Sequence, residues 1–277
     1  MRTSVPADNG AVTPEPYTVV ARNIDPAADN RIHDDDVAQR LGFSGALVPG
    51  VELFAYLTAP FVAAWGEPWL SGGALTVRFR RPVYDGERVV VRTRPAVGEG
   101  ELHVVLEGPD GTERAVGTAA FPDRPGLVDL GHYPVTPLPS PLRAPRPDAL
   151  VPGPFGTVTE LCSAADNGAY CDAVGERLPV YEGGGVVHPG LLLRLVNTAL
   201  MRNVALGPWI HTASACRMLG VARTPTALSV RSVVTELSQR NGHEYVRYDA
   251  LVLSDDVPVL QCDHRAIYAL AGAAELG

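Results

Sequence analysis

The chain carries one pattern of residues twice, separated by about half its length. Residues 27–35 are AADNRIHDD and residues 164–172 are AADNGAYCD. Further along, LVPGV at 47–51 corresponds to VHPGL at 187–191. An apolar, helix-like segment and several strand-like segments follow each copy. This period is much longer than the roughly 20–50 residues of solenoid repeats, so the sequence indicates two copies of one domain fused in tandem.

The two copies differ at positions that could carry chemistry. His33 in the first copy corresponds to Tyr170 in the second, and Pro49 in the first corresponds to His188 in the second. Two equivalent sites would have kept the same residues at these positions. We therefore expect one divided site, to which the halves contribute unequally.

The distribution of proline predicts where the two copies join. The chain has 277 residues and 46% apolar residues, which is enough for two medium domains with substantial cores. Many of its 25 prolines lie between the copies, and proline cannot donate to a sheet ladder. We expect a loose N-terminal arm, a first domain, an extended Pro-rich linker and a second domain, at residues 1–16, 17–122, 123–153 and 154–277.

The apolar patterns predict one long helix and a run of antiparallel strands in each half. The first helix is expected at 51–65, kinked or shortened by Pro60, and the second at 191–204. The dipeptide Asn241-Gly242 predicts a hairpin turn. The expected strands are 74–80, 88–94, 102–107, 113–121, 227–237, 244–254 and 258–269.

Charge and cysteine usage exclude several function classes. The net charge is −8 without a Lys/Arg-rich run, so we expect no nucleic-acid partner; Arg78, Arg80 and Arg81 allow only a local patch for a phosphorylated carrier. No run of about 18 apolar residues predicts a membrane span, and residues 1–16 do not resemble a signal peptide. The four cysteines are scattered, which predicts a cytoplasmic protein without a metal site. One of them, Cys216, is expected to be a core residue.

One long helix laid against an antiparallel sheet, made twice, resembles a double hotdog, an α+β fold in which the halves form a pseudo-dimer. Residues 29–35, DNRIHDD, followed by GFSGALVPG at 42–50, resemble the signature of MaoC-like (R)-specific enoyl-CoA hydratases. That family's pattern is Asp-x-Asn-Pro-Leu/Ile-His-x-Asp, then Gly-Phe-x-Gly-x-Ile/Val-x-His-Gly. The layout covers both halves, whereas the motif is clear only in the first.

The resemblance implies water addition to, or removal from, an acyl thioester on coenzyme A or an acyl carrier protein. A neutral histidine suits proton transfer, which makes His33 the main catalytic candidate. Backbone amides at a helix N-terminus suit an enolate-like oxygen. We expect them at Gly50 and Val51, with Gly190 and Leu191 as their second-half counterparts. No bound cofactor or metal ion is expected.

The chain also departs from the family pattern. The family's catalytic aspartate falls at Ala28 here and at Ala165 in the second copy, and Asp29 lies one position later. Asp29 could replace the lost carboxylate or only cap a turn. The family's histidine before the helix glycine is Pro49, and Arg31 stands in place of the proline. An ordinary Asp–His dyad is therefore not assured.

Five further polar residues are candidates, each with a structural alternative. His188 could face the substrate or bond the orphan amides of the second helix, and Asn30 could position a substrate carbonyl or hold its loop. His211 and Ser214 could line the same cleft or form a satisfied pair at a strand edge. Tyr170 could be an acid or a buried ring.

The sequence supports three functional hypotheses. The first is a hydratase or dehydratase with His33, Asp29 and His188 as catalytic candidates and the acyl chain between the halves, with isomerisation or cyclisation as variants. The second is a non-catalytic hotdog that binds a partner subunit, since both copies lack the aspartate. The third is a hotdog thioesterase, for which Glu52 on the first helix is the candidate carboxylate. A homodimer of two such chains is compatible with each hypothesis.

Overall fold

The computed structural model describes residues 13–24, 30–96, 100–121 and 127–271. Most of the predicted N-terminal arm, the candidate Asp29 and its neighbour Ala28 lie outside these residues. Of the described helices, none is long and apolar enough to cross a membrane.

The first half is built around the helix α2, Gly50–Trp65. Its residues from Val51 to Val62 are all buried, so the helix is surrounded by protein on nearly all sides. The helix continues past Pro60 to Trp65, which means that the proline does not shorten it. It ends at Gly66, whose positive φ of 58° and N–H bond to the Val62 carbonyl terminate the last turn.

Five antiparallel strands of the first half wrap around α2, in the order β1-β3-β4-β5-β2. Buried and exposed residues alternate along β2 as expected for a strand with one face on a core. Three short helices lie outside this sheet: η1 Arg31–His33, α1 Asp35–Arg40 and α3 Glu67–Leu70. The strands are β1 Tyr17–Val20, β2 Ala74–Phe79, β3 Arg88–Pro95, β4 Glu101–Glu107 and β5 Glu113–Ala120.

The second half repeats this arrangement around α5, Pro189–Met201. The strand order continues β8-β11-β10-β9-β6, with β7 also paired to β9. The turn between β9 and β10 has positive φ at Asn241 and Gly242, as the sequence predicts. The strands are β6 Gly153–Pro154, β7 Val158–Cys162, β8 Ile210–Met218, β9 Thr226–Arg240, β10 His243–Ser254 and β11 Val257–Ala269.

Two of the longer second-half elements are absent from the sequence-based expectation. The helix α4, Ala164–Val174, covers the second copy of the repeated motif, whereas the described residues of the first copy, 30–35, form a short 3-10 turn and the start of α1. The strand β8 occupies a segment that we expected to lie between helix and sheet. A further 3-10 segment, η3 Pro179–Gly184, leads from α4 towards α5.

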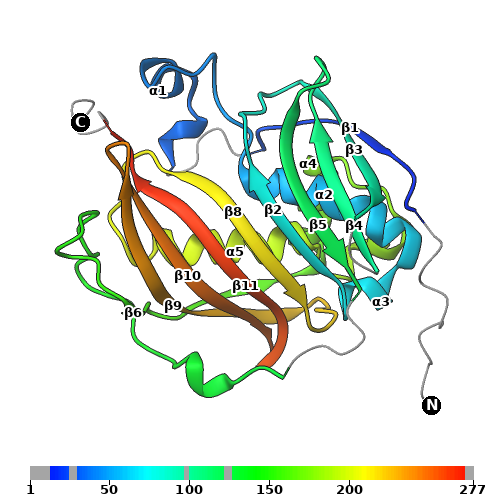
Figure 1. Ribbon diagram of the computed structural model, residues 1–277. Coiled ribbons are helices and arrows are strands. Elements are labelled where there is room, and N and C mark those ends of the chain that lie inside the picture. The colour runs from blue at the N-terminus through cyan, green and yellow to red at the C-terminus, as the bar shows by residue number, and fades with distance from the viewer. Residues whose placement is uncertain (1–12, 25–29, 97–99, 122–126, 272–277) are drawn as a thin grey trace.

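The sheets of the two halves join edge to edge into one eleven-stranded sheet (Figure 1). The join is the antiparallel pair β2–β8, in which Leu75 is opposite Cys216 and Val77 is opposite Ser214. The helices α2 and α5 lie next to each other on the same side of this sheet. At the β2–β8 join, residues of the first half therefore lie directly beside residues of the second half.

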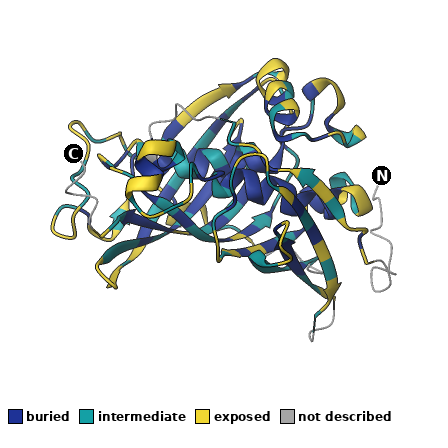
Figure 2. Cartoon of the chain, turned by 90° about the horizontal axis from the view of Figure 1, so that it is seen from above, coloured by how far each residue is buried: buried dark blue, intermediate teal, exposed yellow. Residues whose placement is uncertain are grey.

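One hydrophobic core runs through both halves. It contains Phe54 and Phe61 of α2 together with Leu193 and Val196 of α5, all with no exposed surface. Figure 2 shows that buried residues concentrate in the helices enclosed by the sheet. The four cysteines are buried and unbridged, so Cys216 is a core residue as predicted.

The described part of the Pro-rich segment, 127–153, contains one short 3-10 turn, η2 Leu130–His132, and ends on Gly153, the first residue of the two-residue strand β6. It is attached to the second half through Tyr133, which packs against Leu251 and Leu253. The Tyr133 hydroxyl also accepts a hydrogen bond of 2.8 Å from Gln261 Nε2. The segment therefore runs along the sheet and is not separate from it.

Candidate functional site

A cavity of about 210 Å³ opens where the two halves meet. The first half contributes the loop residues Asn30 and His33 and the helix start at Gly50. The second half contributes Trp209 and His211 at the beginning of β8. Four of the residues predicted for the site thus lie around one cavity: Asn30, His33, Gly50 and His211.

The imidazole of His33 is held in one orientation at the cavity wall. Its Nδ1 lies 2.7 Å from the Leu47 carbonyl oxygen. Because a carbonyl only accepts hydrogen bonds, Nδ1 carries the proton and Nε2 keeps its lone pair. This Nε2 lies 3.3 Å from the side-chain amide nitrogen of Asn30, which donates to it. His33 therefore presents an unprotonated nitrogen at the cavity wall, where it accepts the hydrogen bond from Asn30.

Asn30 connects the loop that contains His33 to the second half. Its Nδ2 donates to the Trp209 carbonyl at 3.0 Å, and its Oδ1 accepts from the Trp209 N–H at 3.2 Å. This pair of bonds fixes which way the amide faces, and it leaves the second Nδ2 hydrogen for His33. Only 6% of Asn30 is exposed, so these bonds are shielded from water. The side chain both anchors the loop and orients His33.

The N-terminus of α2 opens into the cavity without a cap. The N–H groups of Glu52 and Leu53 both donate to the Pro49 carbonyl, and no side chain caps the helix. The first amides, those of Gly50 and Val51, have no acceptor within the helix. Gly50 lines the cavity, whereas the Val51 side chain is in the core. These two N–H groups can bind an oxygen that carries partial negative charge.

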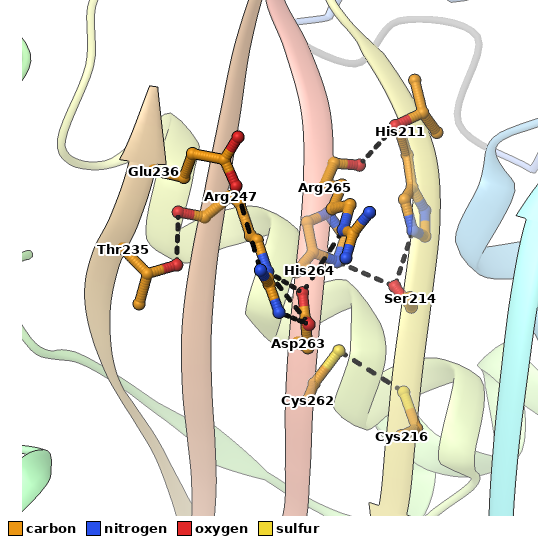
Figure 3. Close-up of polar contacts among 11 residues, drawn as sticks. His211, Ser214, Cys216, Thr235, Glu236, Arg247, Cys262, Asp263, His264 and Arg265 are labelled. Atoms are coloured by element: carbon orange, nitrogen blue, oxygen red, sulfur yellow. Dashed lines mark hydrogen bonds and ion pairs between the residues drawn. The ribbon is translucent and has the colours of Figure 1, made fainter. Parts of the chain in front are cut away.

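Opposite this helix start lies a buried row of polar side chains from β8 and β11 (Figure 3). His211 Nε2 lies 2.8 Å from Ser214 Oγ, which lies 3.0 Å from His264 Nδ1. The two imidazoles stack with ring centroids 4.1 Å apart. Burial lowers the pKa of His211 to about 3 and the pKa of His264 well below its ordinary value. Both rings are therefore neutral at physiological pH.

A β-bulge brings His211 and Ser214 to the same face of the sheet. Residues three apart on a regular strand point to opposite faces. The pairing of β8 with β11 shifts by one residue between Ala213 and His211, so both side chains point inward. His264 also points inward, as the alternation along β11 requires. Sequence analysis missed this residue, although a histidine at an inward position of an apolar strand was a signal that could have identified it.

The equivalent region of the second half is closed. His188 caps α5: its Nδ1 accepts from the Gly190 N–H at 3.0 Å, and its carbonyl accepts from the Leu191 N–H at 2.9 Å. The expected oxyanion site at Gly190 and Leu191 therefore has no free amide. The Tyr170 hydroxyl fills the space beside Gly190, where a Cβ would lie 2.1 Å from it. His188 has no exposed surface and does not line the cavity that contains His33.

The buried His188 has a carboxylate partner that sequence reasoning missed. Glu176 Oε2 lies 3.5 Å from His188 Nε2, and both side chains are at most 3% exposed. Burial raises the pKa of Glu176, but His188 and the amides of Leu178 and Arg177 outweigh it, so the pKa lies below its ordinary value. In the sequence, Glu176 and His188 belong to no common helical or strand pattern, so nothing indicated that their side chains would be neighbours.

Glu52, the candidate thioesterase carboxylate, does not line the cavity. It is 1% exposed, and its Oε1 lies 3.7 Å from Arg194 Nε on α5. The side chain therefore pairs the two central helices. In the part of the chain that the structure describes, no group of three His, Cys, Asp or Glu residues could hold a metal ion.

Comparison with known proteins gives the fold. No protein-family profile and no curated sequence matches the chain. Solved structures do match: a protein designated a MaoC domain dehydratase from Chloroflexus aurantiacus is 13% identical with a TM-score of 0.63, over 98% of this chain and 100% of that one. A conserved double hotdog protein of Mycobacterium tuberculosis is 15% identical with a TM-score of 0.55, over 92% of this chain and 96% of that one.

A protein designated a thioesterase from Novosphingobium aromaticivorans is also similar, at 11% identity and a TM-score of 0.52, over 81% of this chain and 89% of that one. At such identities the likeness is one of fold. Hotdog proteins of this kind include both dehydratases and thioesterases. The chain has the double hotdog fold, which it shares with MaoC-like dehydratases.

Proposed function

We propose that this protein is a hydro-lyase that adds water to, or removes it from, an acyl thioester, and that its halves form a pseudo-dimer with one active site between them. One observation carries the proposal: the basic nitrogen of His33 and the uncapped start of α2 line the same cavity. Acyl-thioester dehydration needs a base and an oxyanion site together.

In dehydration, the substrate displaces the Asn30 N–H from His33 Nε2, and this nitrogen then removes a proton from the carbon next to the thioester carbonyl. The electrons of that C–H bond form the carbon–carbon double bond, and the hydroxyl on the next carbon leaves as water after it takes up a proton. His33 can return the proton it removed, so that atoms and charge balance with one imidazole. Hydration is the same sequence in reverse.

The amides of Gly50 and Val51 would hold the thioester oxygen as negative charge develops on it. Asn30 keeps the His33 ring in place through its bonds to Trp209. Asp29 stays the predicted partner of His33, since it lies outside the described residues. From the second half, His211 faces the cavity, in place of the candidate His188.

The substrate carrier is proposed to be coenzyme A or an acyl carrier protein. Arg81 lines the cavity, and no carboxylate among the described residues lies within ion-pair distance of its side chain. Its neighbour Arg80 is paired with Glu113 at 2.9 Å. A guanidinium at this cavity with no carboxylate partner among the described residues suits a phosphate of the pantetheine arm. Cytoplasmic location and a homodimer of double hotdogs stay predictions.

The test is an assay with 2-enoyl-CoA and 3-hydroxyacyl-CoA substrates of several chain lengths. We expect interconversion of the two, and we expect His33→Ala to lower kcat/KM by at least about 100-fold, equivalent to about 2.7 kcal/mol. His132→Ala is the matched control, because His132 pairs with Asp249 on the surface and does not line the cavity. Equal activity of wild type and His33→Ala would refute the proposed role of His33.

The same assay separates the competing functions. Release of free thiol would indicate a thioesterase, and a product of unchanged mass would indicate isomerisation or cyclisation. Binding without conversion, with an affinity insensitive to His33→Ala, would indicate a binding or scaffold subunit. Each of these outcomes would replace the hydro-lyase proposal.

A further inference from the structure

The second half holds a neutral imidazole against the open start of α2. His211 is 7% exposed, and its Nδ1 has no hydrogen-bond partner although it is buried. A Cβ built on Gly50 would lie 2.7 Å from this nitrogen, so Nδ1 faces the first residue of the helix directly. A buried polar atom without a hydrogen-bond partner lowers the stability of the fold unless a bound ligand supplies the missing hydrogen bond.

The ring cannot turn away from this position. One face stacks on His264, and the edge of Phe79 lies against it with ring centroids 4.8 Å apart. The opposite nitrogen, Nε2, is bonded to Ser214 Oγ. Nδ1 is therefore a fixed group that faces the same space as the amides of Gly50 and Val51.

Ser214 lies between the imidazoles of His211 and His264, so the tautomer of one ring determines the tautomer of the other. A serine hydroxyl has one hydrogen, so Ser214 donates to one imidazole nitrogen and accepts from the other. If His264 Nδ1 carries a hydrogen and donates to Ser214, the serine hydrogen must go to His211 Nε2. His211 then carries its own hydrogen on Nδ1, the atom that faces the helix start.

The alternative arrangement puts a lone pair on His211 Nδ1, which could accept from an amide of α2 and close the site. An incoming carbonyl oxygen is an acceptor only, so it selects the arrangement in which Nδ1 is a donor. Burial keeps both rings neutral, with the pKa of His211 lowered to about 3, so the donor is imidazole and not imidazolium. A neutral imidazole can polarise a carbonyl in this way.

We infer that His211 donates a hydrogen bond from Nδ1 to the thioester oxygen, as a third donor beside the Gly50 and Val51 amides, and that Ser214 and His264 are positioning residues that set its tautomer. The inference rests on the proposed acyl-thioester function and gives the second half a part in the first half's site. His264 acts through its bond to Ser214 and through its stacking on His211, since its ring has no exposed surface and does not reach the substrate.

Two unreactive ligands measure what the thioester oxygen contributes to binding, and the variants show how much of it depends on His211. Butyryl-CoA has the thioester carbonyl, whereas S-butyl-CoA has the same chain without the oxygen, and neither can gain or lose water. We expect wild type to bind butyryl-CoA at least about tenfold more tightly, as a buried hydrogen bond permits. In His211→Phe, which keeps a flat ring and both amides, this preference should fall at least about threefold.

Substitutions at the other two residues test the positioning role. Ser214→Ala and His264→Phe should both reduce the preference for the carbonyl ligand, while affinity for S-butyl-CoA changes little. Ser232→Ala is the matched control, because Ser232 is a buried strand serine whose hydroxyl has no partner. A merely structural role would weaken the binding of both ligands equally and would overturn the inference.

The tautomer can be measured on wild type alone, without a variant that must fold. In ¹⁵N NMR of the butyryl-CoA complex, we expect His211 Nδ1 to be protonated and Nε2 to be unprotonated. The reverse pattern would overturn the inference even if the enzyme is a hydro-lyase. Carbonyl preference with this tautomer but without water transfer would refute the proposed reaction and leave the oxygen site intact. Failure to bind either ligand would overturn both.

Discussion

The two helix starts predict opposite results for the same substitution. Gly50 and Gly190 are the glycines of the repeated Pro-Gly pair, at the starts of α2 and α5. A Cβ at Gly50 would lie in the cavity wall, 2.7 Å from His211 Nδ1 and 2.9 Å from Phe79 Cε2. A Cβ at Gly190 would lie in packed interior, 2.1 Å from the Tyr170 hydroxyl and 2.8 Å from Ala55 Cβ.

For Gly50→Ala we expect a loss of activity. The new methyl group occupies the space between the α2 amides and His211, where we place the thioester oxygen. His211 cannot move easily because Ser214 and His264 hold it. We expect kcat/KM to fall at least about 100-fold, or about 2.7 kcal/mol, comparable to the loss of one oxyanion donor.

For Gly190→Ala we expect a loss of stability. Overpacking of a filled interior costs about 1–3 kcal/mol, and alanine in place of glycine recovers part of this through a lower backbone entropy cost. A net loss of about 1–2 kcal/mol in the free energy of unfolding follows. Urea unfolding measures it, and kcat/KM of the folded variant should stay near wild type.

The pair of variants tests the asymmetry between the halves. Activity of Gly50→Ala within about threefold of wild type would show that the start of α2 does not hold the reacting oxygen. An equal loss of activity in folded Gly190→Ala would show that the second half also has a working site. Either result would refute the reasoning.

Three further predictions concern the second half. Tyr170→Phe removes a buried hydroxyl that has no hydrogen-bond partner, so the free energy of unfolding should be unchanged or rise by up to about 1 kcal/mol, and activity should be retained. A large loss of activity would instead indicate that Tyr170 acts as a general acid. Glu176→Gln should destabilise the protein by about 2 kcal/mol near neutral pH. Because the folded pKa of Glu176 lies below its ordinary 4.5, its charge stabilises the fold above that pH, and the stabilisation is lost as pH falls through the folded pKa. Urea unfolding at several pH values should therefore show the difference from wild type narrowing below about pH 4.5, and a difference that is constant with pH would contradict this. Gly168→Ala, inside α4 with open space around its Cβ position, should raise the free energy of unfolding by about 0.5–1 kcal/mol; a loss of stability in the same measurement would show that the position is not open.

Much of the fold could be predicted because its local signals agree with its long-range structure. The apolar run after Pro49 gave α2, and alternation together with the Asn241-Gly242 turn gave most of the strands. Only the effect of Pro60 was overestimated, since α2 continues past it.

Two elements were missed for physical reasons. In α4, Ser163 and Asp166 form a reciprocal capping box that starts a helix, but the helix has little apolar periodicity that would have indicated it. In β8, the bulge before Ala213 interrupts the alternation on which strand prediction depends. Tertiary pairing with β2 and β11 makes this segment a strand.

The lining of the cavity was predictable where one segment supplies it and unpredictable where the halves meet. His33, Asn30 and Gly50 follow from the motif in the first half. The bond from Asn30 to Trp209 and the row from His211 to His264 depend on the β2–β8 join, which no local pattern encodes. The closure of the second site by His188 and Tyr170 likewise depends on packing around α5.

The central claim is that His33 moves a proton at the carbon beside a thioester carbonyl. Hydration of 2-butenoyl-CoA in D₂O tests it directly, by mass spectrometry of the 3-hydroxybutyryl-CoA that forms. We predict one non-exchangeable deuterium at that carbon with wild type and at least about 100-fold slower incorporation with His33→Ala. Thiol release without deuteration, or equal incorporation by the variant, would contradict the claim.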